Sequence, residues 1–212
     1  MNKSNLSEQA YQLIKLKLAD YEKGSFISAR ESARMYNMSY TPMREALQRL
    51  HREGFLKLIP NVGYFVSSIE VLDVIHIFQV RECMESFMME KVINQITDTD
   101  IQHMEEHNKK QQEYLKKKDI WNYMECDEKF HLTSFIIYGN PILLKTYRNV
   151  REQYKICSAN IIVNNMSTEV YNEHANIIEA FKSRDKDAVV SACRDHIEKA
   201  KNRIIDGFVR VD

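Results

Sequence analysis

The sequence predicts a mainly α-helical protein with a small N-terminal domain and a larger, all-helical C-terminal domain. Two observations support this prediction. Before residue 68, two short helical patterns are followed by a hairpin pattern. Beyond residue 68, strand-like alternation disappears and apolar residues recur at helical spacing. Because 212 residues can hold two separate cores, we expect domains at 1–68 and 69–212.

Two helices joined by a tight turn are predicted in the first domain. The first, residues 28–36, should end at Asn37, since asparagine tolerates the left-handed conformation that such a turn needs. The second should begin with Thr41 as N-cap and Pro42 as its first residue. Apolar residues at helical spacing form its buried stripe, namely Met43, Ala46, Leu47 and Leu50.

Arg44 is the most informative residue of this second helix. It is predicted to lie in the first turn, where the helix macrodipole disfavours a cation, so we expect an external anion as its partner. Thr41, Gln48 and Arg52 share the faces left open to solvent or to a phosphate backbone.

A hairpin is predicted to follow. Gly54 ends the helix, and residues 55–59 and 64–67 read as strands joined by a turn at 60–63. The whole pattern is that of a winged helix-turn-helix. Residues 1–67 contain ten basic and six acidic side chains, and the remainder contains twenty and twenty-four, so the neutral total conceals a basic N-terminal domain.

The segment Ser39-Tyr40-Thr41-Pro42-Met43-Arg44-Glu45-Ala46-Leu47 resembles the S-R-T-P-V-R-E-A-L signature of the GntR family of bacterial transcription regulators. The resemblance implies double-stranded operator DNA as partner, with contacts from Arg30, Ser39, Tyr40, Thr41, Arg44 and Gly63. Tyr40 stands where the family usually has arginine, so a two-point contact is replaced by a single hydroxyl. A winged helix can also serve as a protein-interaction module.

Six helices are predicted in the second domain, at 70–95, 98–117, 119–138, 141–163, 168–183 and 185–208. They should pack as an antiparallel bundle, and Asn140 should cap the fourth. The sequence contains no apolar run long enough to cross a bilayer, and its four cysteines are scattered. We therefore expect a cytoplasmic protein with no membrane contact.

Asp127 and His131 lie four residues apart on one predicted helix, and His174 and His196 lie on two later helices. Taken alone, an aspartate and histidine at this spacing are more often an ion pair or a capped core histidine. The C-terminal region, however, resembles the effector (FCD) domain of the FadR branch of GntR regulators, in which an aspartate and three histidines in this order bind a metal. The resemblance implies a divalent metal here, zinc first, with nickel and manganese as alternatives. Six helices rather than seven suggest the VanR-like subgroup.

Arg81 lies on an otherwise apolar stripe of the 70–95 helix, which requires a partner for its charge. Glu85, one turn on, is the simplest partner. Alternatively, Arg81 clamps a carboxylate effector beside the metal, a role that Arg148 or Arg151 could also fill. The broad apolar face of the same helix predicts a homodimer.

Two motifs suggest enzymes instead. His103 to His107 fits the H-x-x-E-H pattern of a zinc protease group, and Glu128 to His131 fits the E-x-x-H of di-iron bundles. The first lies in a very polar helix and the second lacks its companion motif, so neither pattern has the expected context. The sequence thus predicts a homodimeric regulator that responds to a small organic acid and does no chemistry on it. A regulator for which the metal ion is itself the signal, or a metal-dependent helical enzyme, are the alternatives.

Overall fold

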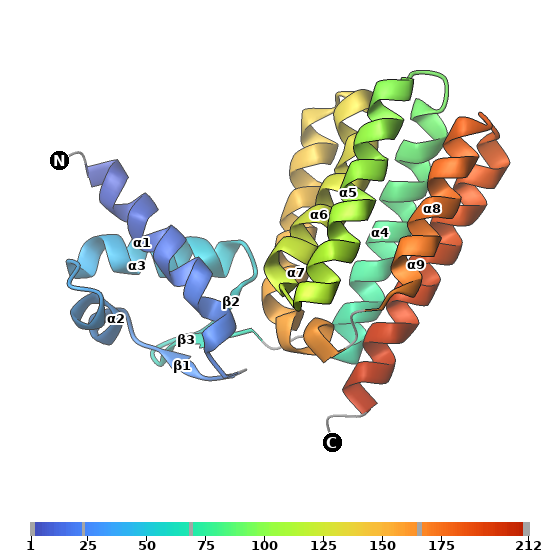
Figure 1. Ribbon diagram of the computed structural model, residues 1–212. Coiled ribbons are helices and arrows are strands. Elements are labelled where there is room, and N and C mark those ends of the chain that lie inside the picture. Colours follow the sequence, from blue (N-terminus) through green and yellow to red (C-terminus); the bar gives the residue numbers. More distant parts are fainter. Residues whose placement is uncertain (1–2, 23, 68–69, 165–166, 210–212) are drawn as a thin grey trace. The chain divides into compact units, whose positions relative to one another are not determined.

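The chain forms two compact units. The computed structural model describes residues 3–22, 24–67, 70–164 and 167–209. One unit comprises Met1–Ile69 with Glu152–Ser158, and the other comprises Glu70–Arg151 with Ala159–Asp212. The first contains a small sheet and the second consists of long helices (Figure 1). The predicted boundary at 68/69 lies outside the described residues. No helix in the described ranges is long and apolar enough to cross a bilayer.

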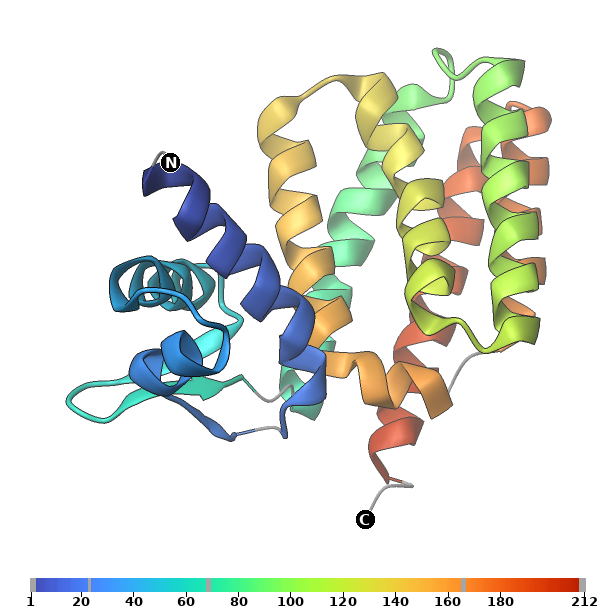
Figure 2. The same ribbon diagram turned by 60° about the vertical axis from the view of Figure 1, so that its left-hand side comes forward.

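The N-terminal unit is a winged helix. Its elements are α1 (Lys3–Lys17), the 3-10 helix η1 (Leu18–Asp20), β1 (Phe26–Ile27), α2 (Ala29–Met35), α3 (Tyr40–Arg52), β2 (Leu56–Ile59) and β3 (Gly63–Val66). The strands form an antiparallel sheet in the order β1-β3-β2, and the β2–β3 hairpin extends from the unit (Figure 2). All four predicted stripe residues of α3 are buried against α1 and the sheet. Strand β1 escaped prediction because two residues show no periodicity.

The start of α3 differs from the prediction. Ser39, in an extended conformation, is the N-cap, and Tyr40 is the first helical residue. Pro42 is therefore the third residue, a position it tolerates because the first four helical N–H groups have no intrahelical acceptor. Arg44 is the fifth residue, so the prediction that it lies in the first turn is wrong. Asn37 does adopt the predicted left-handed conformation, with φ 50°.

Six helices follow in the described part of the chain beyond residue 70, as predicted. They are α4 (Val71–Val92), α5 (Asp98–Lys117), α6 (Ile120–Tyr138), α7 (Pro141–Asn164), α8 (Glu169–Lys182) and α9 (Lys186–Val209). The main difference is that α4 ends at Val92, because the backbone then turns and the N–H groups of Gln95 and Ile96 both donate to the Val92 carbonyl. Asn140 caps α7, its side chain accepting from the N–H groups of Ile142 and Leu143.

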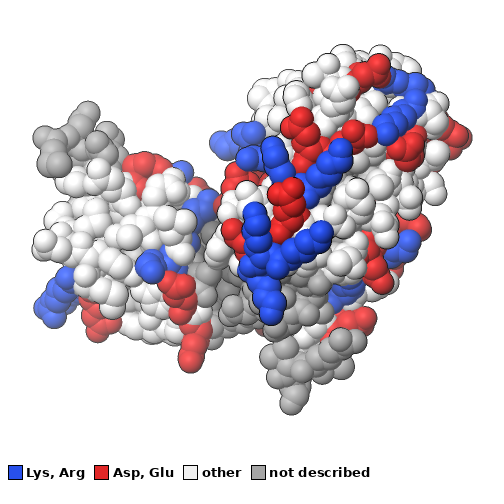
Figure 3. All heavy atoms as spheres, viewed as in Figure 1, with Lys and Arg blue, Asp and Glu red and all other residues white. Residues whose placement is uncertain are grey.

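These helices pack so that α4 contacts α6 and α9, α5 contacts α6 and α8, and α8 contacts α9. A buried cluster of Met88, Leu132, Phe135 and Tyr147 joins α4, α6 and α7. Acidic and basic side chains alternate on the outward face seen in Figure 3, as expected of a solvated helix surface. The arrangement turns one face each of α4, α6, α8 and α9 toward a common interior, and these faces contain the polar site described next.

Candidate DNA-binding surface and metal centre

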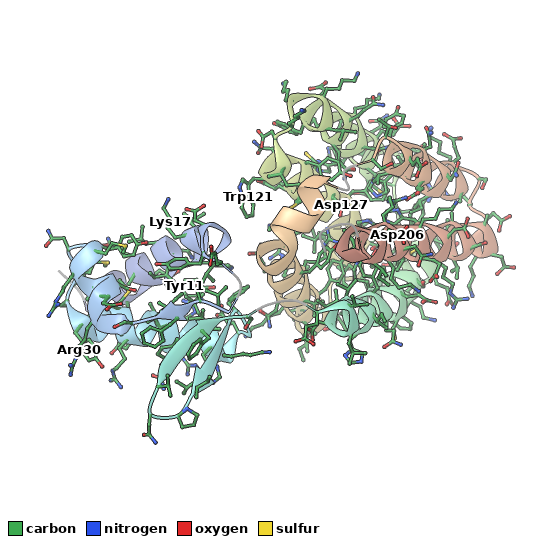
Figure 4. The ribbon with its side chains drawn as sticks, turned by 90° about the horizontal axis from the view of Figure 1, so that it is seen from below. Tyr11, Lys17, Arg30, Trp121, Asp127 and Asp206 are labelled. Atoms are coloured by element: carbon green, nitrogen blue, oxygen red, sulfur yellow. The ribbon has the colours of Figure 1, made fainter. Side chains whose placement is uncertain are left out.

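The residues predicted to contact DNA lie near the beginnings of α2 and α3. Ser39, Tyr40, Thr41 and Arg44 are exposed at the start of α3, and Arg30 is exposed as the second residue of α2. Figure 4 shows Arg30 on the outside of the unit. The structure therefore leaves all five side chains accessible to a partner.

The arginines of α3 differ in what they contact. Arg49 is engaged within the unit, since it pairs with Glu8 at 2.6 Å and Glu53 at 2.9 Å and lies 3.7 Å over the ring of Tyr11. In the described part of the chain, neither Arg30 nor Arg44 forms an ion pair. An exposed guanidinium without an internal carboxylate is available to a phosphate.

Gly63 has a structural role independent of DNA. Its φ is +143°, and a Cβ added there would lie 2.5 Å from Cε2 of Phe26. The Phe26 ring, on β1, therefore fills the space that a side chain would need. The hairpin around it is unusual in composition. From Leu58 to Ser67 no residue is charged, and Leu58, Ile59 and Val62 are 43%, 45% and 57% exposed. The wing tip is thus apolar rather than basic.

The structure brings the four predicted metal ligands together. Asp127 and His131 project from α6, His174 from α8 and His196 from α9, and one possible ligand atom from each lies within 4.8 Å of the others. The three histidines are at most 2% exposed. Figure 4 shows Asp127 among the helices of the bundle, whereas Trp121 lies at its edge.

These imidazoles lack the partners that a buried polar group needs. Both ring nitrogens of His131 and His174 and Nε2 of His196 are buried without a hydrogen-bond partner among the described residues. Leaving a polar atom unpaired in a protein interior costs about 1–3 kcal/mol, so several together indicate that something else occupies the space between them. Three nitrogens and one carboxylate oxygen suit a divalent transition metal.

The geometry and the protonation of the site fit an ion. In an octahedral site with bonds of about 2.1 Å, ligand atoms are about 3.0 Å apart when adjacent and about 4.2 Å when opposite, so modest side-chain shifts suffice here. Burial, followed by the proximity of His196 and His131, keeps the pKa of His174 well below its usual value. Burial also lowers the pKa of His196. Neutral imidazoles retain the lone pairs that a metal requires.

Asp127 has two further partners that the sequence did not assign to it. Its Oδ1 accepts a hydrogen bond from Gln111 at 3.0 Å, and its Oδ2 accepts one from Arg151. Burial alone would raise the pKa of Asp127, but the guanidinium of Arg151 holds it well below its usual value. Arg151, considered from sequence only as a possible effector clamp, thus binds Asp127, one of the four candidate metal ligands, whereas Arg148 is exposed. No sequence pattern pointed to Gln111.

Arg81 pairs with Glu85, as the simpler of the two interpretations predicted. Its Nε donates to Glu85 Oε1 at 2.7 Å, and both side chains are almost fully buried. The hydroxyl of Tyr147 donates to the same carboxylate oxygen at 2.8 Å. Burial would raise the pKa of Glu85, but the charge of Arg81 holds it well below its usual value. The Nη2 of Arg81 is buried with no hydrogen-bond partner within the described chain, so one donor remains free.

The H-x-x-E-H motif from His103 to His107 lies on α5 and contributes no residue to the four-residue cluster. His103 and Glu106 are exposed, and no metal-ligand group among the described residues includes them. His103 and Glu106 therefore face solvent as predicted, whereas His107 is half-buried and its Nδ1 has no hydrogen-bond partner in the described structure.

Comparison with known proteins agrees with this geometry. Residues 6–66 match the bacterial regulatory proteins of the gntR family, and residues 76–199 match the FCD domain. The Nta operon transcriptional regulator of Aminobacter aminovorans is 26% identical over 186 residues, covering 88% of this chain and 87% of that protein. The transcriptional repressor RspR of Escherichia coli is 21% identical over 204 residues, covering 94% and 89%.

Solved structures show the same fold. Escherichia coli McbR/YncC superposes with a TM-score of 0.79 at 19% identity, covering 96% of this chain and 98% of that one. A GntR transcriptional regulator from Rhodococcus gives 0.77 at 16% identity, covering 94% and 97%. A winged helix of the gntR type followed by an FCD domain defines a class of DNA-binding transcription regulators rather than enzymes. Within that class, the chain belongs to the GntR family with a C-terminal FCD domain.

Proposed function

We propose that this regulator binds operator DNA through α2, α3 and the wing, and that a small organic acid controls this binding from a metal-containing site in the helical unit. The proposal rests chiefly on one observation, the convergence of Asp127 and three buried histidines, each of which has an Nε2 without a hydrogen-bond partner among the described residues. Asp127, His131, His174 and His196 would hold the ion, with zinc the first candidate and nickel or manganese the alternatives. When bound, the metal would supply positive charge and an open position for an anionic oxygen.

The charge of the site supports an anionic effector. The ion would lie near two buried guanidinium groups, Arg81 and Arg151, which are balanced by only two carboxylates, those of Glu85 and Asp127. Because the four side-chain charges cancel, a divalent ion would give the site a net positive charge, which favours a carboxylic acid. Arg81 Nη2 is the donor left free to bind that acid. A hydroxy or dicarboxylic acid could place one oxygen on the metal and another on this nitrogen.

A homodimer is the third part of the proposal. Val80 and Phe87 on α4 are 38% and 41% exposed, and Ile77 and Met84 beside them are only partly buried. Apolar side chains in this arrangement form a surface that a second copy could cover. Two copies would place two winged helices on two half-sites of an operator.

The alternative, that the metal ion is itself the signal, is favoured by one observation. Asp127 already accepts hydrogen bonds from Gln111 and Arg151, so an ion must share its carboxylate. The positive charge of the Arg151 guanidinium, bound to the same carboxylate, repels the ion and weakens its binding, which permits reversible occupancy.

DNA titrations of one preparation distinguish these functions. A duplex selected by the protein from a random library would be titrated with metal-loaded, chelator-treated and reloaded protein, each with a panel of hydroxy and dicarboxylic acids. We expect an acid to change DNA affinity only in the metal-loaded samples. A change on chelation with no response to any acid would indicate metal sensing. Identical affinity in every sample would overturn both functions, and failure to select any duplex would overturn DNA binding.

A further inference from the structure

Two of the three candidate ligand histidines lie against a glutamate that is itself held by an arginine. His196 Nδ1 is 2.9 Å from Glu173 Oε2, and Arg203 donates to both oxygens of Glu173 at 2.6 and 2.8 Å. His131 Nδ1 is 2.8 Å from Glu85 Oε2, and Arg81 binds Glu85. Of these two contacts, only the one between His196 and Glu173 has the geometry of a hydrogen bond. His131 Nδ1 and Glu85 Oε2 are close, but neither atom has a hydrogen-bond partner in the described structure. The Glu173 arrangement therefore carries the stronger inference.

The contact determines which nitrogen of His196 can bind an ion. A carboxylate at Nδ1 keeps a proton on that nitrogen, which leaves the lone pair on Nε2. The Nε2 of His196 is the nitrogen that is buried with no partner in the described structure. The carboxylate of Glu173 is itself held in place, because the guanidinium of Arg203 donates to both of its oxygens.

A groove next to the pair explains why His196 needs to be held. The groove has a volume of about 660 Å³ and is lined by α8 and α9, including the small residues Ala180, Ala188 and Ala192 and the side chains of Glu173 and His196. Water in this groove could bond to Nδ1 in place of a carboxylate and would leave the ring free to turn. Glu173 and His196 both line the groove, and Glu173 already occupies the acceptor position at Nδ1 that a water would take.

We propose that Glu173, anchored by Arg203, is a positioning residue of the metal centre, which directs Nε2 of His196 to the ion. The inference rests on the proposed metal function and adds to it a residue that contacts no metal. Outer carboxylates of this kind typically strengthen metal binding 10- to 100-fold. Glu173 immediately precedes the ligand His174, so one turn of α8 both supplies one ligand and orients another.

The test compares Zn²⁺ and Co²⁺ affinities of the full chain and two glutamine variants, measured by competition with a chromophoric chelator. Glu173→Gln removes the charge with little change of shape, and we expect about 10- to 100-fold weaker binding and an altered Co²⁺ absorption spectrum. Glu179→Gln is the matched control, because Glu179 is on the same helix and 69% of its side chain is exposed. The control should bind both ions as the parent chain does.

The result that overturns the inference is unchanged metal affinity and an unchanged Co²⁺ spectrum in Glu173→Gln, even if the variant melts at a lower temperature, since that would leave Glu173 a purely structural role. If Glu173→Gln fails to fold, Arg203→Lys is the second variant, because it retains the Glu173–His196 contact but loses the two-point anchor. Arg203→Lys should bind metal more weakly than the parent chain. Unchanged metal affinity in this variant counts equally against the inference. A parent chain that takes up neither ion would overturn the metal function together with this inference. Binding by the parent chain with unchanged variants removes the inference alone.

Discussion

His174→Ala should remove most of the stabilisation that metal gives to the helical unit. His174 is fully buried on α8, its ring stacks on Phe130 with centroids 4.0 Å apart, and neither ring nitrogen has a partner in the described residues. Without metal, the substitution has two opposing effects. It loses packing against Phe130, which costs about 2–5 kcal/mol, and it removes two unpaired polar atoms, each of which costs about 1–3 kcal/mol in the parent protein. The stability of the metal-free protein should therefore change little.

The metal-dependent part of the stability should change much more. An ion present at about 1,000 times its dissociation constant stabilises the folded state by about 4 kcal/mol. For a chain of this size, 1 kcal/mol corresponds to about 2–4 °C in melting temperature, so the parent protein should gain about 8–16 °C on loading. His174→Ala lacks one of the four candidate ligands, and its gain should be at most a few degrees at the same metal concentration.

Calorimetric melting of metal-free and metal-loaded samples, with metal content measured by plasma emission, provides the assay. His76→Ala is the matched control, because His76 is exposed on α4 and outside the ligand cluster. The control should keep the full gain. If the parent chain shows no gain and holds less than about a tenth of an equivalent of any transition metal, or if His174→Ala gains as much as the parent, the histidines are an ordinary core and the reasoning is refuted.

Three further predictions concern DNA, assembly and signalling. Arg44→Ala should weaken operator binding and reduce its salt dependence by about one phosphate contact. The control Lys110→Ala, which removes an exposed charge from the other unit, should change neither. Equal salt slopes for both variants in a mobility-shift titration would argue against α3 as the recognition helix. Sedimentation equilibrium should give the mass of a dimer at micromolar concentration, and Phe87→Ser should lower it; a single-chain mass with and without DNA would contradict the dimer. Arg81→Ala would also remove the carboxylate clamp, but it would leave Glu85 buried without its cation, which costs about 3–5 kcal/mol. Arg81→Lys is therefore sharper: acid binding by calorimetry should be lost while ligand-free DNA affinity is retained, and unchanged acid binding would exclude the clamp.

Much of the fold could be predicted because its signals are local. Helix ends are encoded by residues such as Asn37 and Asn140, whose side chains and backbone preferences act over a few positions. The start of α3 was predicted two residues late because Thr41-Pro42 fits an N-terminus as well as Ser39 does. N-cap propensity alone cannot choose between Ser39 and Thr41, which lie only two residues apart.

The site was predictable to the extent that its members fit a family pattern. The four candidate ligands follow such a pattern in order and spacing, and the structure brings them together. Glu173, Arg203 and Gln111 follow none, since their contacts span from 16 to 30 residues and depend on how α5, α6, α8 and α9 pack. A glutamate next to a histidine is common in helices, so the sequence does not distinguish Glu173. Its contact with His196 is known only from the packing of α8 against α9.

The proposed DNA-binding surface has a charged part, with Arg30 and Arg44, and an uncharged part, the wing tip, and salt should affect the two differently. Lysine and arginine contacts gain affinity by releasing cations condensed on DNA, and this gain disappears as salt rises. The segment from Leu58 to Ser67 has no charge with which to displace a cation, so whatever affinity it contributes should persist in concentrated salt. Operator titrations extrapolated to about 1 M salt would then measure the uncharged contacts, those of the wing and of Ser39, Tyr40 and Thr41, and their slope would measure mainly Arg30 and Arg44.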